Sequence, residues 1–352
     1  MTRQEYIDIL RSYLTECSVQ EAQELIDDVN QHFDEAAEFG LSEEQTCERL
    51  GDPHELAKEY VHEIPVHAQA TATLGTQRGE YSGVRQLTME LAHCDIEIFR
   101  SENENTIIDI LDTAANEENR IEVLFDMGHL KIRQCRSYTR ILAFLGLGDK
   151  KCTARVWLGT DFVGDLKAAT GSGSVYITGI SANNLSLATG SGHLQAVSIG
   201  ANKVAVKSAS GGINLSTIQT EKLSINGASG TIRTDHISAP KLSCNVASGA
   251  IKMEQTSCQQ ASLVTASGSI TFDCADICNV NATTASGAIR ISLPAWEEMT
   301  INTILASGHV NVGYPASSSG SANKRQFVVG SGVNTVNCKS ASGSISITPR
   351  EP

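Results

Sequence analysis

The protein has 352 residues, a formal net charge of −13 and a hydrophobic fraction of 41%. The acidic balance excludes a general nucleic-acid binder, which needs a basic surface to contact phosphates. The hydrophobic fraction excludes wholesale disorder. The charge is concentrated, because residues 1–63 hold 17 Asp and Glu against 4 Lys and Arg, whereas residues 64–352 hold 23 of each sign. A small acidic part therefore precedes a larger neutral one.

The acidic part has the pattern of a bundle of four short helices. Apolar residues recur at helical spacing in each segment, and capping residues separate the segments. The predicted caps are Ser18 with Glu21, Gly40, Ser42 with Gln45, Gly51, and Asp52 with Pro53 and Glu55. The predicted core consists of Tyr6, Ile9, Leu10, Tyr13, Leu14, Ala22, Leu25, Ile26, Val29, Phe33, Leu56, Ala57, Tyr60 and Val61.

The outer face of this bundle is strongly acidic, and two interpretations remain open. Acidic helix faces are commonly just solvated surface. A patch of one sign can also steer and dock a partner of the opposite sign. The candidate docking residues are Asp27, Asp28, Asp34, Glu35, Glu43 and Glu44.

Residues 1–63 resemble the HAAS signalling domain of Gram-positive bacteria. The resemblance rests on the residues Glu5-Tyr6-Ile7 with Leu10 and Leu14, Asp27-Asp28-Val29 before Phe33, Gly40 to Glu44, and Leu50 to Pro53 before Ala57. It implies a protein partner such as a PadR-like transcriptional regulator, and the acidic face described above would suit a basic surface on that partner. Related proteins often carry membrane segments, but the stretch Ile64 to Gly83 is polar here and contains no membrane helix.

The neutral part contains an internal repeat whose marker is a Ser-Gly pair. The glycines from Gly173 to Gly287 are separated by six intervals of 19 residues, and Gly308, Gly332 and Gly343 follow at irregular spacing. Counted from the glycine, apolar residues recur at +2, +4, +7, +12 and +14. The paired offsets have the period of a half-buried strand, so each repeat is expected to contain two short strands joined by two turns.

Two strands in each repeat of constant length predict a mainly β protein. The expected fold is a parallel β-solenoid (β-helix) of 19-residue coils that follows the small α-helical bundle in the sequence. A leucine-rich repeat is excluded because its L-x-x-L-x-L-x-x-N pattern is absent. We expect an acidic helical domain at 1–63, a linker at 64–80 and a solenoid at 81–350. Within the solenoid, 81–168 would form irregular first coils and a cap, 169–295 the regular coils, and 296–350 irregular last coils.

The Ser-Gly pairs are interpreted as the corners of the coils. Glycine tolerates close-packed or left-handed corners, and serine can hydrogen-bond the adjacent backbone. A stacked row of serines could instead form a binding ladder for ice, glycan or anions. The predicted corner residues are Ser172, Gly173, Ser191, Gly192, Ser210, Gly211, Ser229, Gly230, Ser248, Gly249, Ser267, Gly268, Ser286, Gly287, Ser307 and Gly308.

Residues 80–350 resemble the bacterial putative adhesin family of β-strand-repeat domains. The matching motifs are Ser172 to Val175, Ser191 to Leu194, the later Ser-Gly-x-Ile units up to Ile345, and the strand Asp95 to Ile98. The resemblance implies the repeat fold and no defined function, because the family is one of unknown function.

The sequence shows no catalytic, cofactor-binding or metal-binding motif. Between Ala168 and Lys252 the only acids, Glu221 and Asp235, fall at different offsets, so no carboxylate pair is expected there for general acid-base catalysis. Stacking should bring Cys258 near Cys278. Because there is no C-x-x-C motif, ordinary buried thiols are expected rather than a metal site.

These observations predict a non-enzymatic scaffold, sensor or interaction protein whose acidic domain docks a protein partner, with no direct nucleic-acid binding. The absence of a signal-like apolar segment near Met1 predicts a cytoplasmic protein with free thiols. The alternative is an envelope or surface adhesin that binds glycan or protein. A weaker alternative is a β-helix enzyme acting on polysaccharides.

Overall fold

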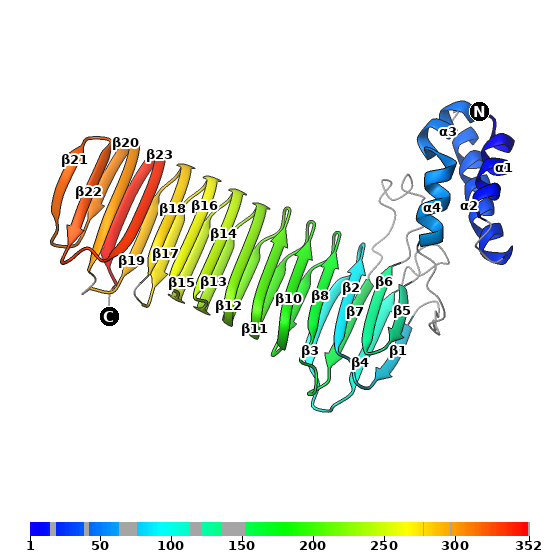
Figure 1. The fold of residues 1–352 in the computed structure, drawn as a ribbon, viewed down its shortest axis with the longest axis horizontal. Coiled ribbons are helices and arrows are strands. Elements are labelled where there is room, and N and C mark those ends of the chain that lie inside the picture. Colours follow the sequence, from blue (N-terminus) through cyan, green and yellow to red (C-terminus); the bar gives the residue numbers. More distant parts are fainter. Residues whose placement is uncertain are drawn as a thin grey trace. The chain divides into compact units, whose positions relative to one another are not determined.

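The computed structural model describes residues 1–14, 19–38, 42–62, 76–112, 121–134, 152–276, 278–295 and 298–350. These residues form two compact units, one helical and one built of strands (Figure 1). Among them, no helix is long and apolar enough to cross a lipid bilayer.

The helical unit contains α1 (Arg3–Tyr13), α2 (Val19–Glu38), α3 (Glu43–Leu50) and α4 (Pro53–His62). The predicted capping box of Ser42 and Gln45 is confirmed at the start of α3, which ends at Gly51 with φ of 80°. The carboxylate of Asp52 accepts a hydrogen bond from the His54 amide at 2.8 Å, as expected at the start of α4. The predicted caps Ser18 and Gly40 lie outside the described residues.

The core of the helical unit follows most of the predicted apolar stripe. Its buried residues are Tyr6, Ile7, Leu10, Leu14, Leu25, Ile26, Val29, Phe33, Cys47 and Ala57. Ile9 and Tyr13 were predicted to be in the core, and this is wrong, because they are 39% and 47% exposed. Helix α1 needs only a narrow stripe to contact its partners, and Tyr13 instead lies against the ring of His54, 4.6 Å away between centroids.

The strand unit begins with β1 (Thr76–Tyr81), β2 (Gln86–Leu91), β3 (Asp95–Arg100), β4 (Thr106–Asp112), β5 (Ile121–Asp126), β6 (His129–Gln134) and β7 (Cys152–Leu158). Strand β1 therefore starts inside the segment predicted as a linker. The repeats follow in β8 (Asp165–Thr170), β9 (Val175–Thr178), β10 (Ser181–Thr189), β11 (Leu194–Ser208), β12 (Ile213–Ser229), β13 (Ile232–Ser238), β14 (Lys241–Ser248), β15 (Ile251–Ser257), β16 (Gln260–Ser267), β17 (Ile270–Cys274), β18 (Asn279–Ser286) and β19 (Ile289–Leu293).

The chain ends in β20 (Met299–Val312), β21 (Ser317–Ser321), β22 (Lys324–Val329) and β23 (Asn334–Pro349). The repeat strands stack in two parallel ladders. In the first ladder Leu194 pairs with Ile213, and in the second Lys203 pairs with Lys222, each 19 residues on. The predicted parallel solenoid is therefore confirmed.

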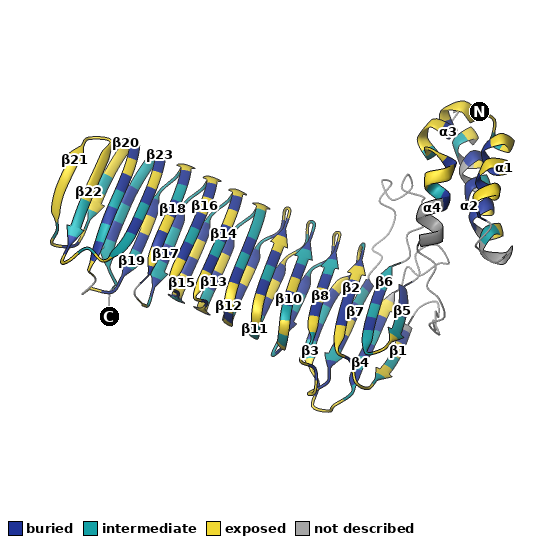
Figure 2. Cartoon of the chain, in the orientation of Figure 1, coloured by how far each residue is buried: buried dark blue, intermediate teal, exposed yellow. Residues whose placement is uncertain are grey.

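The core lies between the two ladders and follows the predicted offsets. In the coil after Gly192, the residues Leu194, Ala196, Ile199, Val204 and Val206 are all buried. Figure 2 shows the resulting alternation of buried and outward positions along the repeat strands. Because every coil shares its core with two neighbours, the fixed offset maintains the register.

One corner of five successive coils is formed by a residue in the left-handed region. It lies at +6, where Gly179, Ser198, Thr217, His236 and Gln255 have φ between 45° and 70°. This reversal directs the next residue inward, which explains the single apolar position at +7, as at Ile199 and Ile218. The sequence pattern indicated the inward residue but not the left-handed residue before it.

The other corner is a column of glycines in close contact. A Cβ added to Gly211 would lie 1.7 Å from the carbonyl oxygen of Gly192, and one added to Gly192 would lie 2.0 Å from that of Gly173. The column runs from Gly173 to Gly287 and continues through Gly343 to Gly308. Gly332 does not belong to it, because it lies in the connection after β22 and faces Thr300 instead.

In several coils a buried hydroxyl three residues before the glycine stabilises this corner. Thr189 Oγ1 accepts a hydrogen bond from the Gly192 amide at 3.1 Å and donates one to the Gly173 carbonyl at 2.8 Å. Thr265 and Thr284 donate in the same way to the glycine of the preceding coil. The serines of the Ser-Gly pairs are exposed instead, and only some bond the backbone, as Ser229 does.

Both ends of the solenoid depart from sequence order. At the first end, β2 and β3 pair directly with β8 and β9, and the chain between them adds β6 and β7 on the outer side. At the last end, β23 lies between the coil of β18 and β19 and the coil of β20. The antiparallel strands β22 and β21 then cover β20, so the tail after Trp296 provides the predicted cap.

We expect Gly211→Ala to destabilise the solenoid by about 3 kcal/mol or more, because the new methyl group would overlap the backbone of the next coil. Gly200→Ala is the matched control, since its nearest neighbour would be 3.9 Å away, and its effect should stay within about 0.5 kcal/mol. Urea unfolding followed by circular dichroism measures both. Equal effects would contradict the close-contact interpretation.

We expect Thr189→Val to cost about 2 kcal/mol, because it leaves the Gly192 amide and the Gly173 carbonyl without their hydroxyl partner. Ser191→Ala, two residues on but exposed, should change stability by less than about 0.5 kcal/mol. The same unfolding measurement applies. A larger loss for the serine variant would place the structural hydroxyl in the Ser-Gly pair instead.

Candidate functional site

A shallow groove of about 260 Å³ lies on the outer surface of the first ladder, across four successive coils. It is formed by β11, β12, β13 and β15, whose outward residues at +3 and +5 line up because the register is constant. The lining residues are Gln195, Val197, Asn214, Leu215, Ser216, Arg233, Thr234, Asp235, Lys252 and Glu254.

The charges of this groove are arranged in two columns. Arg233 pairs in register with Lys252, and Asp235 with Glu254, so like charges stack about 4.8 Å apart. The charges of one column are neutralised by those of the other, since Lys252 Nζ lies 2.7 Å from Glu254 Oε1. The groove is thus a polar strip of alternating charge. Glu254 lies just beyond the stretch from Ala168 to Lys252 in which no carboxylate pair was expected, and it pairs in register with Asp235.

Two neighbouring carboxylates raise the question of general acid-base catalysis. A catalytic acid usually needs a desolvated site that holds its proton. The side chains of Asp235 and Glu254 are 45% and 50% exposed, and each has a charged or polar neighbour, His236 and Lys252 respectively. Neither carboxylate therefore lies in a desolvated site.

The second ladder carries a column of three lysines. Lys203, Lys222 and Lys241 pair in register, and all three are exposed. Within the described part of the chain none of them forms an ion pair with an acid. Such a column attracts anionic groups, because the like charges are held at one strand spacing without neutralisation.

The predicted docking acids of the helical unit occupy different environments. Asp27 and Glu44 are exposed on α2 and α3. Asp34 forms an ion pair with Arg3, and this hydrogen bond lowers the pKa of its carboxyl. Glu43 accepts a hydrogen bond from the Arg3 amide at 3.1 Å. The side chains of Asp28 and Glu35 lie outside the described residues.

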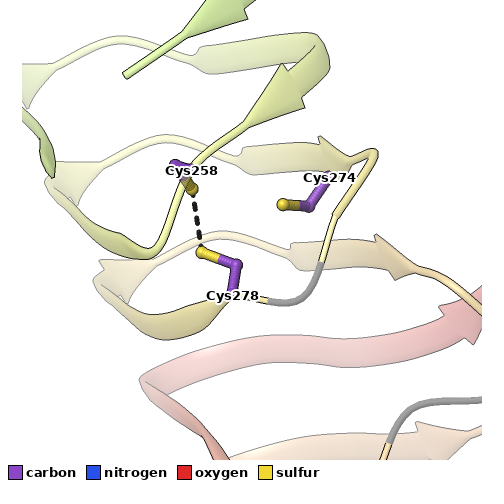
Figure 3. A group of neighbouring side chains, drawn as sticks. All are labelled: Cys258, Cys274 and Cys278. Atoms are coloured by element: carbon purple, nitrogen blue, oxygen red, sulfur yellow. Dashed lines mark hydrogen bonds between the residues drawn. The ribbon is translucent and has the colours of Figure 1, made fainter. Parts of the chain in front are cut away.

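Three cysteines converge inside the solenoid. The sulfur atoms of Cys258, Cys274 and Cys278 lie within 4.8 Å of one another, and all three residues are buried. The Cys258 and Cys278 sulfurs are 2.8 Å apart, and Figure 3 shows the Cys274 side chain beside them. The sequence predicted the approach of Cys258 to Cys278 but not the third thiol, because Cys274 lies at a different offset.

The environment of these thiols differs from that of the other buried cysteines. Burial raises the pKa of Cys244 and of Cys338 to about 12, so both stay protonated. In the cluster, hydrogen bonding among the three thiols lowers the pKa of Cys274 and raises the pKa of Cys258 and of Cys278. The three thiols therefore titrate as one coupled group, unlike the isolated buried cysteines.

The remaining cysteine pair corrects one expectation. Free thiols were predicted throughout, but Cys94 and Cys152 form a disulfide. Cys94 precedes β3 and Cys152 begins β7, and these strands pair in register, so the two residues stand opposite each other. Their separation of 58 residues hid this contact in the sequence.

A family model described as Toastrack DUF4097 matches residues 84–348, which span both ladders of the solenoid. The chain belongs to this Toastrack family. The HAAS family model matches residues 5–59, which cover most of the helical unit. Both resemblances seen in the sequence are thus confirmed.

No curated protein matches the sequence significantly. Among solved structures, a "putative lipid binding protein" from Parabacteroides distasonis is 19% identical, with a TM-score of 0.44, and covers 80% of this chain and 98% of its own. A "putative adhesin" from Bacteroides fragilis is 13% identical, with a TM-score of 0.39, and covers 78% and 98%.

A "putative cell adhesion protein" from Clostridium sporogenes is 12% identical, with a TM-score of 0.25, and covers 79% of this chain and 100% of its own.

Proposed function

We propose that this Toastrack protein is a non-enzymatic interaction protein located in the cytoplasm. In this proposal the helical unit docks a protein with a basic surface, such as a PadR-like regulator. The solenoid supplies a rigid surface. The observation that carries the proposal is that residues 1–63 hold the entire net charge of the chain.

The exposed carboxylates of the helical unit support this role. Asp8, Asp27, Glu44 and Glu48 are exposed on three helices, and only a few cations of the unit are available to neutralise them. A field of one sign accelerates encounter with an oppositely charged partner and suppresses binding to acidic ones. The solenoid contributes little to this field because its charges balance.

The test is the affinity of the full chain for a purified PadR-like regulator, measured by calorimetry at several salt concentrations. Reversing two predicted docking acids, Asp27→Lys with Glu44→Lys, should weaken binding by about 10-fold or more and reduce its salt dependence. The matched control is Glu102→Lys with Asp161→Lys, which makes the same charge change at exposed solenoid positions. Equal weakening by both variants would overturn the docking site.

The second candidate function is an envelope or surface adhesin, and the Cys94–Cys152 disulfide favours it. Disulfides persist mainly in oxidising compartments. The column of Lys203, Lys222 and Lys241, which forms no ion pair with the acids that the structure describes, would suit an anionic glycan or an acidic protein. In this candidate the solenoid, rather than the helical unit, binds the ligand.

Cell fractionation with immediate thiol alkylation separates the two candidates. The cytoplasmic interaction protein should appear in the cytoplasmic fraction, with Cys94 and Cys152 alkylated by the reagent. The adhesin should appear in the envelope fraction with the two residues joined, as identified by mass spectrometry of the linked peptides. Recovery of alkylated protein from the cytoplasm would contradict the adhesin.

A further inference from the structure

The cysteine cluster lies where the regular solenoid is interrupted. In the preceding coils the inward position at +9 holds small residues, such as Ala201 and the fully buried Ala239. In the next coil this position is taken by Cys258, and in the coil after it Cys278 lies one residue further on, at +10. The sulfurs of these two adjacent coils approach each other to 2.8 Å.

A register shift brings the third sulfur to the same place. Between β15 and β17 the pairing slips, so that Thr256 at +7 lies opposite Cys274 at +6. Cys274 consequently points into the core at the corner, where earlier coils carry an inward residue such as Ile237. Its relative exposure is 0%, and the cluster is shielded from solvent on this side.

The spacing of the three sulfurs suits a metal ion. A bond of about 2.3 Å from metal to sulfur places the sulfurs about 3.8 to 4.0 Å from each other. All three sulfurs lie within 4.8 Å of one another, and only the Cys258 and Cys278 sulfurs, at 2.8 Å, would need to separate, by about 1 Å. Both are in turns outside the strands, where such a shift disturbs no ladder hydrogen bond.

The donor set selects the kind of metal. Within the described residues the cluster contains sulfur only and no histidine or carboxylate. Magnesium and calcium need oxygen ligands, and structural zinc sites take four protein ligands, whereas monovalent copper is a soft ion that prefers sulfur.

We propose that Cys258, Cys274 and Cys278 bind one monovalent copper ion in a three-sulfur site inside the solenoid. This site is independent of the docking function of the helical unit. The thiol protons pass to solvent as the ion binds. In the metal-free protein, the Cys274 thiol donates a hydrogen bond to the Asp276 carbonyl at 3.3 Å.

The test is an anaerobic titration of the reduced full chain with Cu(I), in competition with a chromophoric copper chelator. We expect one tightly bound ion per chain and a sulfur-to-copper charge-transfer band. Cys258→Ala should weaken binding by about 100-fold or more, and it should fold, because Ala239 fills the same place one coil earlier. Thermal unfolding checks the fold of each variant.

Cys338→Ala is the matched control, because Cys338 is a buried thiol of the same solenoid and pairs in register with Ala282. It should bind copper as the unaltered protein does. Equal affinity of the two variants, or no copper retained against the chelator, would overturn the proposal. Preferential uptake of Zn²⁺ in a parallel titration would also overturn it, since it would require a fourth ligand.

Discussion

The close contact of glycines at one corner is the constraint on which the rest of the solenoid depends. Parallel strands stack about 4.8 Å apart only if the turns between them can do the same. At this corner the backbone of one coil lies so near the next that a Cβ on Gly192 or Gly211 would overlap a carbonyl group. Glycine removes the obstacle, and Thr189 and its equivalents satisfy the backbone groups that the tight turn buries.

A fixed corner has consequences for both faces of the coil. Since each coil must return to the glycine column after 19 residues, an inward residue always stacks on an inward residue. Leu194 lies on Ile213, and Lys203 on Lys222, in one constant register. The core therefore gains continuous apolar columns, while the surface has to accept columns of like charge. The ends escape this rule only because β2 with β3, and β23, are inserted out of sequence order.

The repeating features of the solenoid were predictable from the sequence, whereas the features that occur only once were not. The apolar offsets that begin at Val175 or Ile213 predicted the two strands of each repeat and their buried faces. A period of two at constant repeat length indicates a strand with one buried face. The buried hydroxyl of Thr189 could have been found, since Thr or Ser recurs three residues before several glycines. The position of β23 could not have been found, because its alternating pattern fits any strand at the end of the solenoid. Gly332 was misleading, because it follows a serine as the corner glycines do but lies outside the glycine column.

The same limits apply to the sites. The acidic surface of the helical unit was visible in the composition, but the ion pair of Asp34 with Arg3 depends on how α1 packs on α2. The approach of Cys258 to Cys278 was predicted from their nearly equal positions in successive 19-residue coils. Cys274 joins them only because the register slips by one residue, and no periodic pattern reports a slip.

The geometry of a solenoid also decides where chemistry can occur. Outward side chains on neighbouring coils run parallel into solvent, so Asp235 and Glu254 remain exposed although they are adjacent in register. Inward side chains at a corner converge on a small buried space, where desolvation strengthens every interaction between them. A site that needs several groups around one atom is therefore favoured inside a corner. Such a site requires the repeat to change its residue type, and in this chain Cys258 replaces the small inward residue in the coil where the register slips.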